Sequence, residues 1–391
     1  MKKALRFVYS SVALTCVLLV SLELAGQLAF RLVKGFPLYE IDQHLIASAA
    51  EQPIEEHPFL VGRLRAGVRV QDGHNVLSAT ANHTRWTGAH EGTPGAIRIA
   101  VVGGSTTFGA RVSDEETWPA RLQALLGPRY VVTNFGMPGY SSAEAVIQMA
   151  LLVPETKPDV VVFYEGWDEL HNYHDAGLGP DYYGHGLRQY ANLDLQPPQP
   201  RGLFAKLIEV SAVSRLAMIL ADELPSRSAR RPPSASRSPG APSADPDTVV
   251  ERLFRRNLTT LKVLARQSGA AYVMFIPQVL DPSRFQGDTS NGWTPRIRNY
   301  AMPSLLGRIN RITGGMCADS EAWCTVFHDP EARSWAHDEF IDEGHFSGKG
   351  NDAFARLLAA RLKSDVGRHL TQPSRKYWIA AGSATGPDYS R

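Results

Sequence analysis

A serine, an aspartate and a histidine in this chain have the residue types of a nucleophilic catalytic triad. Ser105 follows an apolar run and two glycines in the segment AIRIAVVGGSTTFG (96–109), whereas Asp342 and His345 lie three residues apart near the other end of the chain. A serine hydroxyl is a weak nucleophile unless a histidine removes its proton, and a carboxylate on the other ring nitrogen orients that histidine. These residues predict acyl transfer through an acyl-serine intermediate. The alternative is structural, because a serine here also commonly caps the helix that follows it.

Alternating strand and helix patterns predict the scaffold that brings these residues together. Short apolar runs bounded by turn residues indicate strands, and longer segments with apolar residues at helical spacing indicate helices. Strands are expected at 97–102, 130–135, 160–164, 271–276 and 324–327, and helices at 117–126, 143–152, 249–268 and 351–363. This order predicts an α/β fold, a three-layer flavodoxin-like sandwich with a mostly parallel sheet of about five strands.

The carboxyl ends of these strands carry the candidate site. The first strand is followed by Gly103–Gly109, the second by a loop with Gly139, and the third by Gly166–Glu169, while the Asp342–His345 pair precedes the last helix. In a parallel sheet these loops lie at one edge, where α/β proteins bind their ligands. The glycines before Ser105 let the chain turn sharply and expose the hydroxyl and the nearby N–H groups.

In these blocks and in their order, residues 97–362 resemble the SGNH, or GDSL-like, hydrolase superfamily of esterases and acyltransferases, of a bacterial membrane-anchored type. The resemblance implies that Ser105 is the nucleophile and that Asp342 and His345 complete its triad. It also implies an oxyanion hole formed by the N–H groups of Ser105 and Gly139 and by the side chain of Asp168. The chain order Ser, Asp, His without a Gly-x-Ser-x-Gly motif argues against the nucleophile elbow of α/β-hydrolases.

Two blocks depart from the family pattern. Gly103-Gly104-Ser105 stands where the family has Gly-Asp-Ser, and Gly166-Trp167-Asp168-Glu169 stands where it has Gly-x-Asn-Asp or Gly-x-Asn-Glu. The first departure spares the triad. An ionised Asp168 would repel an oxyanion, whereas a protonated one would donate a hydrogen bond, and the neighbouring Glu165 and Glu169 favour protonation. A third option is that Asp168 turns away and the hole relies on backbone N–H groups alone.

Three aromatic residues flank the candidate site in the sequence. Phe108, Tyr140 and Trp167 either line the substrate pocket, where they would stack on a sugar ring or hold an acyl chain, or pack in the core. The glycines of 103–109 also invite comparison with a phosphate-binding loop. That interpretation is disfavoured because no lysine precedes Ser105.

Histidines and cysteines outside the triad allow two further interpretations. His171 and His174, together with His345, are the residue types of a metal-dependent hydrolase, although exposed loop residues also explain them. Cys317 and Cys324 enclose a short polar segment, CADSEAWC, which predicts a disulfide in an oxidising compartment. Two thiols alone make a poor zinc site.

The amino-terminal segment 1–34 has the pattern of a membrane anchor. Three basic residues precede an apolar run, 7–30, that contains one acidic residue, Glu23. At about 1.5 Å per residue this run is long enough to cross a hydrocarbon core of about 30 Å. The basic start favours a cytoplasmic amino terminus and export of the rest. The segment therefore predicts a single-pass protein of the inner (cytoplasmic) membrane, with its catalytic domain in the periplasm or outside the cell. A cleaved signal peptide is the alternative.

Composition shifts divide the remaining chain. The expected parts are an extracytoplasmic lead-in segment with short strands at 35–95, a catalytic domain at 96–370 with an insertion at 175–247, and a flexible tail at 371–391. Within the insertion, residues 225–247 are rich in Pro, Ser, Ala and Arg without periodicity, which predicts disorder. Residues 204–220 have an amphipathic helical pattern that fits a segment covering the site or touching the membrane.

Overall composition fits a globular enzyme rather than a nucleic-acid-binding protein. The 391 residues include 41 basic and 39 acidic ones, a net charge of +2, and 43% are hydrophobic. A charge this balanced gives no electrostatic case for nucleic acid. We expect a serine esterase that acts, without a cofactor, on ester-linked acyl groups, acetyl included, of small molecules, envelope glycans or lipids. The alternatives are an O-acyltransferase and a catalytically weak or inactive relative that binds glycan or an assembly partner.

Overall fold

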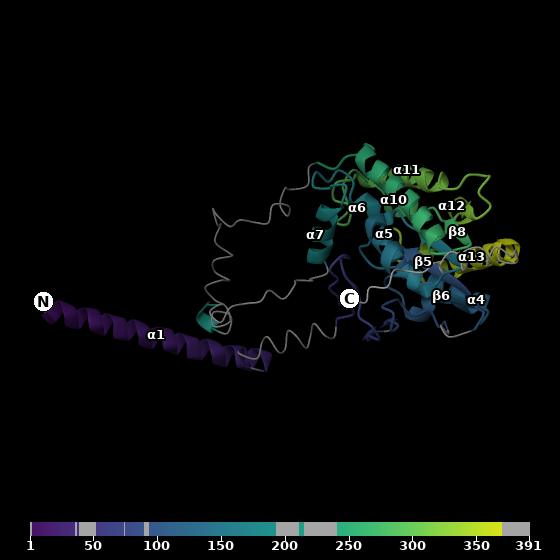
Figure 1. Cartoon of the computed structure of the whole chain (residues 1–391). Helices are drawn as coiled ribbons and strands as arrows, with labels where there is room; N and C mark the ends of the chain where they lie inside the picture. The colour runs from purple at the N-terminus through teal and green to yellow at the C-terminus, as the bar shows by residue number, and fades with distance from the viewer. Residues whose placement is uncertain are drawn as a thin grey trace, which may run out of the picture. The chain divides into compact units, whose positions relative to one another are not determined.

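The computed structural model of the chain describes residues 2–35, 37–38, 52–73, 75–89, 94–192, 211–214 and 241–369 (Figure 1). The chain divides into two compact units, residues 1–52 with 196–236 and residues 53–195 with 237–391. Three sequence-based expectations fall outside the described residues. They are the disordered segment as far as residue 240, the amphipathic helix at 204–220 apart from 211–214, and the tail at 371–391.

A five-stranded sheet forms the centre of the second unit. Its strands are β5 (Ile97–Gly103), β6 (Tyr130–Asn134), β7 (Val160–Tyr164), β8 (Tyr272–Phe275) and β9 (Cys324–Val326). They are arranged in the order β6-β5-β7-β8-β9, and every neighbouring pair is parallel. This order is the flavodoxin-like arrangement, and the predicted α/β fold is confirmed. The carboxyl ends of all five strands therefore lie at one edge of the sheet.

Helices cover both faces of this sheet, because alternate residues of each strand point to opposite faces. On β5, Ile99 and Val101 face a core formed with α4 (Trp118–Leu126) and α13 (Gly348–His369). The intervening Ala100 and Val102 face a second core, formed with α5 (Ser142–Leu151), α10 (Thr248–Gln267) and α11 (Met302–Gly314). Figure 1 shows the two helical layers on either side of the strands. Each fully buried valine or leucine stabilises this packing by roughly 1.5–3 kcal/mol.

Short helices form the connections at the edges of the sheet. They are α3 (Ser105–Phe108), η2 (Asp114–Glu116), η3 (Val153–Thr156), α6 (Trp167–His171), α7 (Tyr183–Asn192), η4 (Pro282–Arg284), η5 (Asn299–Ala301), α12 (Asp329–Ala332) and η6 (His337–Glu339). The last helix, α13, begins at Gly348, earlier than expected. The Ser347 hydroxyl accepts the N–H of Gly350 and caps this start. The sequence did not predict it because Gly348 and Gly350 have low helix propensity.

The lead-in segment contributes short strands and one buried arginine to the second unit. Its strands β1 (Ile54–Glu55) and β2 (Arg63–Leu64) form one antiparallel pair, and β3 (Arg69–Asp72) and β4 (Asn75–Ser78) form another. Arg85 follows them, and its backbone N–H donates to the carbonyl of Asn134 at the end of β6. The lead-in is thereby hydrogen-bonded to the central sheet.

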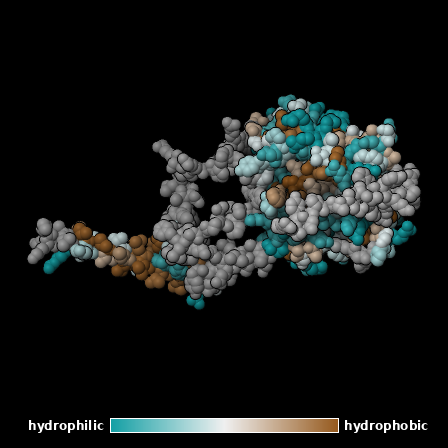
Figure 2. Space-filling view, in the orientation of Figure 1, coloured by the Kyte–Doolittle hydropathy of each residue, from teal (hydrophilic) through white to brown (hydrophobic). Residues whose placement is uncertain are grey.

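The first unit contains one long apolar helix, α1 (Lys2–Lys34). Its segment Arg6–Val33 is long and apolar enough to cross a membrane by length and composition. Figure 2 shows apolar side chains along this helix. The Glu23 carboxylate accepts hydrogen bonds from the backbone N–H of Ala212, at 2.8 Å, and from the hydroxyl of Ser211, at 2.8 Å. The one acidic side chain of the apolar run is therefore paired within this unit.

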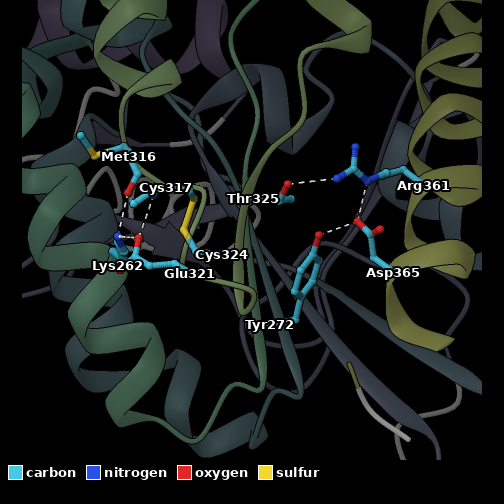
Figure 3. The surroundings of a disulfide bond; sticks show 10 residues. Lys262, Tyr272, Met316, Cys317, Glu321, Cys324, Thr325, Arg361 and Asp365 are labelled. Atoms are coloured by element: carbon cyan, nitrogen blue, oxygen red, sulfur yellow. Dashed lines mark hydrogen bonds and ion pairs between the residues drawn. A yellow bond between two sulfur atoms is a disulfide. The ribbon is translucent and has the colours of Figure 1, made fainter. Parts of the chain in front are cut away.

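A disulfide joins Cys317, after α11, to Cys324, the first residue of β9 (Figure 3). The Cα atoms are 5.4 Å apart, and the loop between the cysteines carries Glu321. Lys262 of α10 donates to the Met316 carbonyl at 2.8 Å and forms an ion pair with Glu321. The loop is thus fastened to the sheet by a covalent bond and to α10 by a charged contact.

Candidate active site

Ser105, His345 and Asp342 form one continuous chain of hydrogen bonds at the carboxyl edge of the sheet. The Nε2 atom of His345 lies 2.8 Å from the Ser105 Oγ atom. On the other side of the ring, Nδ1 lies 2.8 Å from Oδ1 and 2.9 Å from Oδ2 of Asp342. Residues 240 positions apart are therefore within hydrogen-bond reach, in the geometry of a nucleophile, its base and an orienting carboxylate.

A tight turn holds Asp342 and His345 in this arrangement. The Oδ1 atom of Asp342 accepts the backbone N–H groups of Gly344, at 3.1 Å, and of His345, at 2.9 Å. The Ile341 N–H donates to the His345 carbonyl at 2.9 Å and closes the turn. Burial alone would raise the pKa of Asp342, but the His345 side chain and these backbone donors hold it well below its ordinary value. Asp342 is therefore ionised and oriented toward the ring.

Ser105 stands directly after β5, at the first turn of α3. The N-cap of α3 is Gly104, which has no side chain, and the Ser105 hydroxyl meets His345 instead of a backbone N–H of its own helix. The Thr107 hydroxyl fixes α3 by donating to the Tyr164 carbonyl at the end of β7, at 2.9 Å. A β-carbon on Gly103 would lie 2.1 Å from the Thr107 Oγ1 atom, so this approach requires glycine.

Gly139 offers a backbone donor beside the serine. It lies in the loop between β6 and α5 with φ of +79°, a conformation that favours glycine. The Met137 N–H donates to the Gly103 carbonyl at 3.1 Å and fastens this loop to the end of β5. Among the described residues, no backbone acceptor receives the Gly139 N–H. A backbone N–H without a backbone acceptor at this edge is the kind of group that stabilises an oxyanion.

Asp168 does not turn away from the site. It is buried, 3% exposed, in the first turn of α6, and the backbone N–H of Ser105 donates to its carboxyl group. Burial, and then the charges of Glu169 and Glu144, raise the pKa of Asp168 well above its ordinary value. Its Oδ2 atom has no hydrogen-bond partner among the described residues. The neutral acid is therefore the favoured form, with one oxygen free to carry the proton.

Further buried acidic groups surround Asp168. Burial raises the pKa of Glu165, with additional contributions from Asp168, Glu169 and Glu144. Burial also raises the pKa of Glu169, although the Ser142 N–H and hydroxyl donate to its carboxylate and oppose the shift. This crowding of carboxyl groups in a dry environment favours protonation of some of them.

The three aromatic candidates are all buried. Phe108 (4% exposed) and Tyr140 (1% exposed) pack in the core under the lead-in segment, where Tyr140 donates its hydroxyl proton to the Gly62 carbonyl. Trp167 stacks on Trp293 with ring centroids 5.0 Å apart and the planes 11° from parallel. The burial of Phe108 and Tyr140 in this cluster agrees with core packing, the alternative that the sequence left open.

The histidines of the metal interpretation are engaged elsewhere. The Nδ1 atom of His171 lies 2.6 Å from the Trp293 carbonyl, and burial lowers the His171 pKa to about 4. The Nε2 atom of His174 lies 3.0 Å from the Asp245 carbonyl. Within the described ranges, no group of three or more His, Cys, Asp or Glu side chains is arranged to hold a metal ion.

Two arginines that the sequence did not single out contact the site. Arg85, 2% exposed, donates to the carbonyls of Phe108, at 3.0 Å, and Val112, at 2.7 Å, and pairs with Asp114 at 3.1 Å. It braces the loop that follows Ser105. Arg111, in that loop, has φ of +68° and donates to the Asp342 Oδ2 atom at 2.9 Å. Nothing local in the sequence marks either arginine, since each acts on a distant segment.

Comparisons with known proteins add structural similarity only. No family model matches the chain, and no curated protein matches it. Among solved structures it is similar to TesA, with 16% identity and a TM-score of 0.38 over 68% of this chain and 99% of that one. It is also similar to a GDSL-like lipase from Bacteroides thetaiotaomicron (12% identity, TM-score 0.37, 68% and 88% coverage) and to the acetyl xylan esterase AlAXEase (14%, 0.36, 68% and 100%). Scores at this level leave the activity to be argued from the chain's own geometry.

Proposed function

We propose that this protein is a serine esterase of SGNH type that cleaves ester-linked acyl groups through an acyl-serine intermediate. The observation that carries the proposal is the contact of 2.8 Å between the Ser105 hydroxyl and an imidazole whose other nitrogen meets the Asp342 carboxylate. A serine with a purely structural role does not require a hydrogen-bonded histidine whose other ring nitrogen contacts an ionised carboxylate.

The proposed reaction begins with attack of the Ser105 oxygen on the ester carbonyl carbon, while His345 removes the hydroxyl proton. The resulting imidazolium is stabilised by Asp342. Collapse of the tetrahedral intermediate breaks the bond to the leaving alcohol, which takes the proton from His345. Water, deprotonated by the same histidine, then hydrolyses the acyl-serine to a carboxylic acid and restores the hydroxyl.

We propose that the oxyanion of each tetrahedral intermediate is held by the Gly139 N–H and by Asp168. The Ser105 N–H, which the resemblance also assigns to the oxyanion hole, donates to the Asp168 carboxyl group in this structure. In this proposal a neutral Asp168 carries its proton on Oδ2, a buried oxygen that lacks a partner among the described residues. The raised pKa of Asp168 favours this protonated form. The aspartate thus supplies the hydrogen bond that the resemblance assigns to an asparagine, and one such donor is worth on the order of 10²–10³-fold in rate.

The proposed compartment and substrate class rest on the anchor. α1 and its basic start support a single-pass protein of the inner membrane with the catalytic unit in the periplasm or outside the cell. The disulfide fits an oxidising compartment. Acylated envelope glycans or lipids are the esters available there, and acetyl esters are the simplest of them.

The decisive experiment uses the full-length protein purified in detergent, with a fluorophosphonate probe and 4-nitrophenyl acetate as substrate. We expect the probe to label the parent and not Ser105→Ala, and His345→Ala to lose both labelling and hydrolysis. Ser320→Ala, which removes the hydroxyl of an exposed serine in the loop between Cys317 and Cys324, serves as the control. Absence of labelling and hydrolysis in the folded parent would support the inactive, glycan-binding alternative, and hydrolysis abolished by a chelator would support a metal enzyme. Transfer to a sugar hydroxyl in preference to water would indicate an O-acyltransferase.

A further inference from the structure

Helix α7 packs two buried side chains on the Gly139 loop. The Nε2 atom of His185, whose side chain is fully buried, lies 2.9 Å from the Gly139 carbonyl oxygen. A β-carbon on Gly139 would lie 2.8 Å from the Oε1 atom of Gln189, so the two residues are in close contact. α7 belongs to the long connection after β7, which the sequence predicted only as an insertion (Figure 1).

The Gly139 carbonyl matters because it shares a Cα atom with the Gly139 N–H. Glycine has wide freedom in φ and ψ, so a glycine N–H points in a fixed direction only where the surrounding structure restrains it. Gly139 is held at φ of +79°. A hydrogen bond to its carbonyl from one side, and packing of Gln189 on its Cα, restrain both torsions at once. These contacts therefore set the direction of the Gly139 N–H.

The His185 ring that contacts the Gly139 carbonyl is itself held in place on its other side. Its Nδ1 atom lies 2.9 Å from the Oδ1 atom of Asn172, which also accepts a hydrogen bond from Arg188 at 2.8 Å. Both ring nitrogens therefore lie within hydrogen-bond distance of oxygen atoms, and these contacts fix the orientation of the ring. The Glu144 carboxylate lies 3.6 Å from Nε2.

α7 itself is fastened at points that do not involve Gly139. Tyr182, just before the helix, donates its hydroxyl proton to Glu169 at 2.9 Å. Arg188, on the same helix, forms an ion pair with Asp175. The helix is thus held against α6 independently of the contact that His185 makes. His185 can be changed without removing these attachments, which makes its own contribution measurable.

We propose that His185 is a positioning residue of the oxyanion hole: it holds the Gly139 carbonyl from α7, so that the Gly139 N–H points at the developing oxyanion. This inference rests on the proposed esterase function. It gives the connection after β7 a role in the reaction, because α7 contacts Gly139 itself, whereas the bonds of Met137 and Tyr140 restrain the loop on either side of it. Misplacement of a transition-state donor by about 1 Å costs on the order of 10²-fold in rate.

The test compares His185→Leu with His185→Gln in the full-length protein. Leucine removes the hydrogen bond, whereas the amide of glutamine can still donate to the Gly139 carbonyl. We expect His185→Leu to lower kcat for 4-nitrophenyl acetate on the order of 10–100-fold with KM changed less than about twofold. We expect His185→Gln to recover most of this loss. Affinity for a methyl trifluoromethyl ketone, whose serine adduct carries an oxyanion, should fall in parallel with kcat.

Two control variants separate positioning from loosening of the helix. Tyr183→Leu changes an exposed residue of α7, 67% exposed, and should leave kcat unchanged. Asp175→Asn removes the ion pair with Arg188 but leaves the contacts of Asn172 with Arg188 and His185 in place, and it should cost much less than His185→Leu. A folded His185→Leu protein with kcat within twofold of the parent would overturn the inference, as would an equal loss in Asp175→Asn. Hydrolysis that survives Ser105→Ala is a different result, and it overturns the proposed function together with this inference.

Discussion

The Oδ2 atom of Asp168 lies 2.2 Å from the position that a β-carbon on residue 104 would occupy. Real β-carbons do not approach other atoms so closely, so Gly104 and Asp168 depend on each other. These are also the two positions at which the chain departs from the pattern it resembles, where an aspartate precedes the serine and an asparagine stands at 168. The absence of a side chain at residue 104 makes room for the carboxyl group at residue 168.

Gly104→Ala should destabilise the protein and lower its activity. The new methyl group meets the Asp168 carboxyl and also the Tyr140 carbonyl oxygen, at 2.9 Å, and overpacking of this kind costs about 1–3 kcal/mol. Thermal unfolding measures the cost, and Gly104→Ala combined with Asp168→Gly should be less destabilised than the sum of the two single variants. Strict additivity of the two substitutions would show that the contact is absent.

Asp168→Asn should be as active as the parent at neutral pH, or more so, and should respond differently to alkali. Because the pKa of Asp168 is raised by burial and by Glu169 and Glu144, the parent loses its O–H donor as pH rises through that pKa, whereas an asparagine amide donates at every pH. The stability that neutral Asp168 contributes is likewise present at lower pH and lost as pH rises through its folded pKa.

The measurement for Asp168→Asn is kcat for 4-nitrophenyl acetate across neutral and alkaline pH, with the exposed substitution Asp338→Asn as control. Asp338 pairs with Lys349 on the surface, so its loss should not change the profile. An inactive but folded Asp168→Asn beside an active parent would refute the donor role of the neutral acid.

Arg85→Met should lower the free energy of unfolding, because Arg85 holds the loop that follows Ser105. The substitution leaves the Asp114 carboxylate buried without its cation and removes the Arg85 hydrogen bonds to the carbonyls of Gly109 and Val112. Breaking a buried ion pair costs about 3–5 kcal/mol. Urea unfolding should show the loss, and Arg356→Met, which breaks an exposed pair with Asp352, should change stability by less than about 1 kcal/mol. Equal effects of the two substitutions would contradict the bracing role of Arg85.

Replacing Cys317 and Cys324 together by serine should lower stability without lowering catalysis. The disulfide closes a loop of seven-residue separation, for which the chain-entropy estimate is about 2–3 kcal/mol. Cys324 opens β9, at the edge of the sheet opposite the carboxyl ends that carry the site. We expect a lower Tm, with kcat at 25 °C within twofold of the parent. A large loss of kcat in folded protein would mean that the loop is coupled to the site.

Several features of the fold could be read from local pattern. The strands at 97–102, 160–164 and 324–327 agree with β5, β7 and β9 to within one residue at each end. Fully buried parallel strands appear in sequence as short apolar runs, and their alternation with helical patterns specifies a parallel sheet. The predicted start of the last helix, at residue 351, is wrong because the helix begins at Gly348. The Ser347 hydroxyl caps that start, and such a cap depends on geometry that composition does not reveal.

Other features could not be read in this way. Phe108 and Tyr140 were candidates for the substrate pocket because they flank the site in sequence, but they lie in the core under the lead-in segment. Arg85 contacts Phe108, 23 residues away along the chain, and His185 contacts Gly139, 46 residues away, and no periodicity or motif links the partners. Such contacts depend on which surfaces the packing brings together.

The sequence by itself determined the order of elements and the parallel sheet, and it singled out Ser105, Asp342 and His345 as candidates, because these inferences depend on hydrophobic periodicity and on chemistry that few residue types supply. Only the tertiary structure decided that the Ser105 hydroxyl meets His345 across 240 positions and that Asp168 is buried among other carboxyl groups. The reason is physical. A distance between remote segments and the dielectric environment of a side chain are properties of the packed molecule, and neither is present in any local stretch of the chain.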